Sequence, residues 1–187
     1  MNASTKTSKT PIRTGYWANA DLDEPDFTFL QGIMLTSELT MPIHLDDYLH
    51  GVCSVAALAL HDIFGYQILS LYDVSEARGS GIKSKYSGSF PIIHDFCFDP
   101  KHDIYIDVRG ICSDFDEFIS EFDDFIEDPQ NARDWTTKIG SAKKYRAANE
   151  DAMGKETFNY YYTAVAAWVK SHKEMYMVAN ANGGKHD

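Results

Sequence analysis

The 187-residue sequence has no long hydrophobic run. A membrane-spanning helix needs about 20 consecutive, mostly apolar residues, and no stretch approaches that length. The N-terminal segment MNASTKTSKTPIRTG is polar and lacks the apolar core of a secretory signal. We therefore expect no membrane segment, and the sequence predicts a cytoplasmic protein.

Cysteine is also scarce. The chain has three cysteines, Cys53, Cys97 and Cys112, an odd number without the spacing of a disulfide framework. We interpret Cys97 and Cys112 as packing residues. There is no C-x-x-C pair and no paired histidine spacing, which disfavours zinc at Cys53, Cys97, His94 or His102. We expect no metal and no cofactor.

Positively charged residues are few: the chain has 17 lysines and arginines against 28 aspartates and glutamates, and its formal net charge is −11. Such a chain repels nucleic-acid phosphates, so we expect no direct binding to DNA or RNA. The same charge suits a basic protein partner or substrate, or mimicry of nucleic acid, and it also favours solubility. Nothing in the sequence indicates an oligomeric state.

The chain does have the composition of a folded domain, with 44% hydrophobic and 24% charged residues. We expect residues 1–14 to be a disordered lead-in, residues 15–180 a single α+β domain, and residues 181–187 a flexible tail. Residues 17–40 show no clean period and predict an irregular arm with a short helix near 27–36. The Gly/Ser-rich segment 76–89 is expected to be a flexible loop and a candidate lid.

Clearer patterns follow. Helical spacing after Cys53 ends at Gly65, where a left-handed residue belongs, and residues 66–73 predict a strand. The runs 90–98 and 103–110, joined by Asp99-Pro100-Lys101-His102, predict a β-hairpin. Residues 113–128 predict an amphipathic helix with a carboxylate face, and residues 157–179 predict a final helix. Residues 130–153 are polar, with no strong period.

The order of these elements brings together a thiol, an imidazole and a carboxylate. A helix N-terminus and a nearby imidazolium both lower the pKa of a thiol, and the thiolate is the nucleophile. With the turn centred near Pro100–Lys101, His94 lies opposite residue 107, and facing Cβ atoms are about 4.5–5.5 Å apart. The spacing therefore predicts a His94–Asp107 hydrogen bond, with Asp107 fixing the tautomer of His94.

The segments GVCSVAALALHDIFGYQI, IIHDFCF and IYIDVRG resemble small bacterial and phage proteins of the papain-like/transglutaminase-like superfamily. The resemblance covers about residues 48–112. It implies an α+β core in which the cysteine-bearing helix packs on a small antiparallel sheet, with extra C-terminal helices. It also implies Cys53 as nucleophile, His94 as general base and acid, and Asp107 as orienter. The implied activity is thiol-dependent acyl transfer on an amide, as in a peptidase, a deamidase or a transglutaminase-like enzyme, which share a thioester.

One position departs from that pattern. Papain-type enzymes carry a glutamine six residues before the nucleophile, whereas this chain has Asp47, whose carboxylate repels a developing oxyanion. The oxyanion role then falls to the Cys53 backbone N–H, to Tyr48 or His50, or to no residue, as in a catalytically dead relative.

A different class of function stays open. Cys53 and His94 can also be read as core residues, and Asp107 as a partner of Arg109. The chain would then be a non-catalytic acidic binding protein, such as a phage or host interaction factor, on a degenerate papain-like fold. Its partner-binding candidates are the carboxylates Asp116, Glu117, Asp123 and Asp124.

Overall fold

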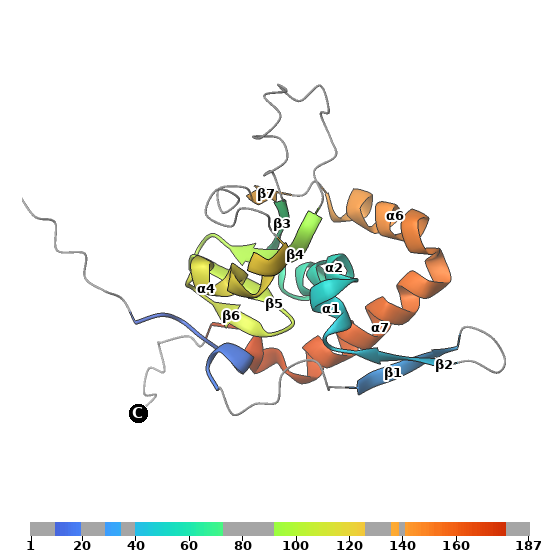
Figure 1. Cartoon of the computed structure of the whole chain (residues 1–187), viewed down its shortest axis with the longest axis horizontal. Coiled ribbons are helices and arrows are strands. Elements are labelled where there is room, and N and C mark those ends of the chain that lie inside the picture. Colours follow the sequence, from blue (N-terminus) through green and yellow to red (C-terminus); the bar gives the residue numbers. More distant parts are fainter. Residues whose placement is uncertain are drawn as a thin grey trace, which may run out of the picture.

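The computed structural model describes residues 10–19, 29–34, 40–72, 92–125, 136–138 and 141–178. Its centre is a five-stranded antiparallel sheet in the order β6-β5-β4-β3-β7. The strands are β3 (Gln67–Tyr72), β4 (Ile92–Asp99), β5 (Ile104–Asp107), β6 (Gly110–Cys112) and β7 (Thr136–Lys138). Figure 1 shows this sheet beside the C-terminal helices.

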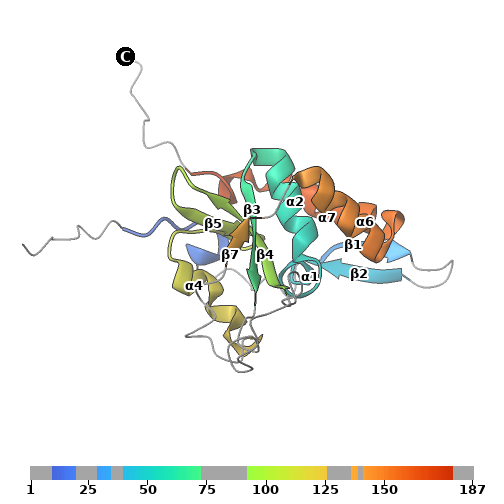
Figure 2. The same cartoon turned by 90° about the horizontal axis from the view of Figure 1, so that it is seen from above.

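Helices cover both faces of the sheet. One face packs against α2 (Cys53–Phe64), which lies between the sheet and α7 (Lys155–Ser171), as Figure 2 shows. The other face packs against α4 (Phe115–Ile119) and the 3-10 helix η3 (Ser120–Phe125). The remaining elements are η1 (Gly15–Trp17), α1 (Asp47–His50), α6 (Ala142–Met153) and η4 (Lys173–Met175). The expected α+β class is therefore confirmed, with the cysteine-bearing helix on an antiparallel sheet and further helices at the C-terminal side.

The main helix forms where the sequence predicts it. Residues 55–60 of α2 are all buried, which matches its run of alanine, leucine and valine and its place between two layers. Gly65 ends the helix in a left-handed conformation with φ of 79°, and its amide donates to the His61 carbonyl at 2.7 Å.

Several expectations need correction. The helix expected near 27–36 is wrong, because β1 (Phe29–Met34) pairs with β2 (Thr40–His44) as an antiparallel hairpin. The segment 130–153 contains β7 and the 12-residue helix α6. The helix expected over 113–128 changes from α to 3-10 geometry at Ser120, and the final helix covers 155–171.

The beginning of the chain is tied to the sheet from residue 12 onward. Ile12 accepts a hydrogen bond from the Ser113 amide at 3.0 Å, and Thr14 donates its amide to the Ile111 carbonyl at 3.0 Å. Part of the predicted lead-in thus runs along β6. The predicted loop 76–89 and the predicted tail 181–187 lie outside the described residues. Within the described residues, no helix is long and apolar enough to cross a membrane.

Candidate active site

Cys53 is the first residue of α2 and is only partly buried. The residue before it, Val52, gives the helix no side-chain cap, so the Cys53 amide is one of the N–H groups that a helix leaves without an internal partner. The ladder between β4 and β5 ends at the Cys97–Ile106 pair, and β4 continues beyond it. There the amide of Asp95 donates to the Cys53 sulfur at 3.3 Å.

His94 and Asp107 come together as the sequence predicts, but from a different register. The observed pairs Phe98–Tyr105 and Cys97–Ile106 centre the turn between Lys101 and His102, one residue later than expected. Asp107 is therefore level with Phe96 and not with His94. Because residues two apart on a strand share a face, His94 still reaches Asp107 diagonally, with 3.1 Å between His94 Nε2 and Asp107 Oδ2.

Arg109 holds the Asp107 carboxylate from the other side. Its backbone amide donates to Asp107 Oδ1 at 2.9 Å, and its guanidinium donates to Oδ2 at 2.6 Å. Burial alone would favour the protonated acid, but the Arg109 charge and the hydrogen bonds from His94 and Arg109 outweigh it and keep the pKa of Asp107 well below its ordinary value. Asp107 is therefore ionised at neutral pH.

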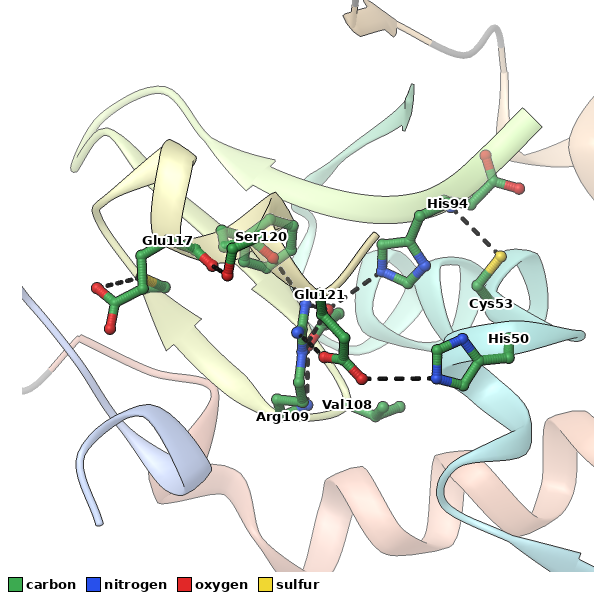
Figure 3. Close-up of polar contacts among 12 residues, drawn as sticks. His50, Cys53, His94, Val108, Arg109, Glu117, Ser120 and Glu121 are labelled. Carbon is green, nitrogen blue, oxygen red and sulfur yellow. Dashed lines mark hydrogen bonds and ion pairs between the residues drawn. The ribbon is translucent and has the colours of Figure 1, made fainter. Parts of the chain in front are cut away.

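The His94 ring is buried, with 1% of its surface exposed, and stacks on Phe122 of η3 with centroids 4.3 Å apart. Burial lowers the pKa of His94, whereas hydrogen bonding to Asp107 and to the Cys53 thiol raises it, and the net result is a pKa of about 9. Nδ1 has no hydrogen bond of ordinary geometry to any described residue. In Figure 3 the ring lies beside the Cys53 sulfur, so Nδ1 is the nitrogen left for proton exchange with it.

The two oxyanion candidates lie in different places. Tyr48 is fully buried, and its hydroxyl donates to the Tyr161 carbonyl at 2.6 Å, so it is not available as an oxyanion donor. The Asp47 carboxylate accepts the His44 amide at 2.8 Å. His50 lies at the rim of the site, with its Nε2 3.5 Å from Glu121 Oε1 (Figure 3). The Cys53 backbone N–H, which has no partner within α2, stays a candidate donor.

Glu121 links this rim to the buried carboxylate, because it pairs with the Arg109 guanidinium as well as with His50. Beside them, His50, Ile92, Ile93 and Phe122 line a cavity of about 240 Å³. Phe122 lies within the predicted amphipathic helix over 113–128, but that pattern did not indicate that its ring would cover His94. Glu121 carried no signal that set it apart from the other carboxylates of 114–128.

The proposed acidic docking residues are not one exposed cluster. Glu117 is engaged by Arg13, whose Nε lies 3.0 Å from Glu117 Oε2. Asp116 is exposed on α4. Asp123 and Asp124 belong to η3, and their side chains lie outside the described part of the structure.

The other two cysteines are packing residues, as expected. Both are fully buried, and the Cys97 thiol donates to the Ala57 carbonyl at 3.2 Å. Among the described residues there is no group of three or more histidine, cysteine or acidic side chains that could hold a metal ion.

Comparison of the chain with models of protein families, with curated proteins and with solved structures finds no match.

Proposed function

We propose that this protein is a thiol-dependent acyl-transfer enzyme that acts on an amide, with a papain-like/transglutaminase-like arrangement of its core. The observation that carries the proposal is the pattern of hydrogen bonds and the raised pKa of His94. Its Nε2 is bound to Asp107, its Nδ1 has no hydrogen bond of ordinary geometry to a described residue, and its pKa is raised in part by the Cys53 thiol. Cys53 as nucleophile, His94 as base and Asp107 as the carboxylate that orients the base would form the general triad arrangement.

In the proposed reaction the Cys53 thiolate attacks the carbonyl carbon of an amide, and a carbon–sulfur bond forms. The oxyanion is stabilised by the Cys53 backbone N–H at the start of α2. His94 gives its Nδ1 proton to the nitrogen as the carbon–nitrogen bond breaks, leaving a thioester. Water or an amine, deprotonated by His94, then attacks the thioester and releases the thiolate. Peptide cleavage, deamidation and transglutamination all fit this scheme.

Selective alkylation tests the nucleophile. Native protein is treated with iodoacetamide at about pH 6.5, where an ordinary thiol is almost entirely protonated. We expect Cys53 to be modified at least about tenfold faster than in the His94→Ala variant, because an imidazolium partner favours the thiolate. The buried Cys97 and Cys112 serve as internal controls in the same digest. Modification of Cys53 only after unfolding would contradict the proposal.

Acyl transfer needs its own measurement. With p-nitrophenyl acetate we expect a burst of nitrophenol and an acetyl group on Cys53, both absent from Cys53→Ser. Under the alternative, an acidic binding protein, Cys53→Ala would leave function intact. Charge reversal at Asp116, Glu117, Asp123 and Asp124 would then abolish it.

A further inference from the structure

A second buried carboxylate lies next to the proposed site, and the proposed reaction does not use it. Asp95 follows His94 on β4 and points to the opposite face of the sheet, where 4% of its surface is exposed. Its oxygens accept hydrogen bonds from the Ser70 hydroxyl on β3 and from the Tyr145 hydroxyl on α6. Within the described residues no lysine or arginine pairs with it. Burial of a carboxylate without a cationic partner costs free energy, and here the side chains that bind it contribute hydroxyl groups.

The contacts around Asp95 form a closed ring. Asn149, one turn after Tyr145 on α6, donates to the Tyr145 carbonyl at 3.0 Å and accepts the Ser54 hydroxyl at 2.6 Å. Ser54 is the neighbour of Cys53 in the first turn of α2. The ring closes at the nucleophile, because the Asp95 amide donates to the Cys53 sulfur at 3.3 Å. These hydrogen bonds therefore connect the sulfur to β4 and α6 as well as to its own helix α2.

We propose that Asp95 and Tyr145 are positioning residues that hold the Cys53 sulfur beside His94 by fixing β4 and α6 to the start of α2. This inference rests on the function proposed above. Neither side chain donates to the substrate in this scheme. Asp95 acts through its own backbone amide, and Tyr145 acts through Asp95.

The charges at the site explain why the hydroxyl groups are needed. Among the described residues, the ionisable groups that interact with the Asp95 carboxyl are His94 and Cys97 from β4 and Tyr145 from α6, and both His94 and Tyr145 also interact with Cys53. Burial raises the pKa of Asp95, and the Ser70 and Tyr145 hydrogen bonds oppose that rise. When Tyr145 loses its hydroxyl, Asp95 keeps one side-chain donor and α6 loses its link to β4. The Asp95 amide, which donates to the Cys53 sulfur, is then no longer held in a fixed position.

The test measures the rate of Cys53 alkylation by iodoacetamide from about pH 5 to about pH 9 in Tyr145→Phe and Asp95→Asn, with every protein kept below its unfolding temperature. We expect the rate at neutral pH to fall about tenfold in each variant, since one hydrogen bond to a charged group is lost, and the profile to move to higher pH. Tyr162→Phe is the matched control. It also removes a tyrosine hydrogen bond to an aspartate, the one to Asp62, but at an exposed place.

The outcomes separate the two proposals. If native Cys53 is unreactive, the proposed function fails and this inference fails with it. If native Cys53 is reactive and both variants keep its pH profile within about twofold, only the positioning role is overturned, even where the unfolding temperature drops. If the pH profile of Cys53 alkylation moves to higher pH in both variants while Tyr162→Phe keeps the native profile, the positioning role is supported.

Discussion

At the scale of single residues, Asp107 is the buried carboxylate that connects His94 to Arg109. It accepts hydrogen bonds from His94 and Arg109 at once, and Arg109 in turn lies over Trp17 with its guanidinium carbon 4.3 Å from the ring centroid. Because the guanidinium keeps Asp107 ionised, the carboxylate can orient His94 and stabilise its charged form but cannot take up its proton. The charged form of His94 is thus part of the resting site.

The raised pKa of His94 makes folding stability depend on pH. A histidine with a pKa of about 6.5 when unfolded and about 9 when folded stabilises the native state fully below pH 6.5. That contribution is lost as the pH rises through about 9, and it amounts to about 3 kcal/mol at most. We expect the free energy of unfolding, measured in urea, to fall between about pH 6 and about pH 9.5 in the native protein. His94→Gln should remove most of this slope, and an equal slope in the variant would show that another group titrates.

At the scale of elements, the sequence predicted those parts of the fold that have strong local patterns. The helix 53–64 has an apolar run closed by Gly65, and the hairpin of β4 and β5 has two apolar runs around a short turn. The turn centre lies one residue later than predicted, yet the predicted contact between His94 and Asp107 is present. A shift of the turn centre by one residue changes the facing partner by two, and two residues apart is the same face of a strand.

Elements that depend on distant contacts were not predictable in the same way. Helix α6 is polar, and Asn149 is its only buried residue, so no apolar stripe marked it. Its local signals were the N-cap Ser141 and the glycine after Met153, which a reading of caps could have used. Strand β1 is defined by its pairing with β2. The contacts of Tyr145 and Glu121 arise because α6 and η3 pack beside the site, and no local sequence pattern predicts such packing.

The turn that presents Asp107 and Arg109 depends on Gly110. Its φ is +115°, and a Cβ there would lie 2.8 Å from the Thr14 carbonyl oxygen. We expect Gly110→Ala to lower the free energy of unfolding by about 2–4 kcal/mol, through backbone strain plus the clash with the N-terminal segment. Gly65→Ala is the control, because Gly65 also has a positive φ but its Cβ would meet nothing within 4 Å. Equal losses in the two variants, measured by urea unfolding, would exclude a contribution from the Thr14 contact.

At the scale of the whole molecule, the formal charge of −11 acts on anything that approaches the site. A field of this size attracts cations from a distance and repels anions, and salt weakens both effects because the Debye length is about 10 Å at 0.1 M. Cys53 is only partly buried, and the reactivity of its thiol would measure this field at one defined atom. It also connects the two interpretations of the chain, since a basic substrate and a basic partner would be attracted alike.

We expect the doubly cationic disulfide cystamine to react with Cys53 faster than the anionic reagent dithiobis(nitrobenzoate), after each rate is divided by its rate with a free thiol. The ratio should fall at least about fivefold between about 0.02 M and about 0.5 M salt, while the rate with neutral iodoacetamide stays constant. Reversing Asp116, Glu117, Asp123 and Asp124 to lysine changes the formal charge from −11 to −3 and should lower the ratio at low salt. If the ratio changes neither with salt nor on charge reversal, the field of the acidic residues does not act at the Cys53 thiol. A preference for basic substrates would then lose its physical basis.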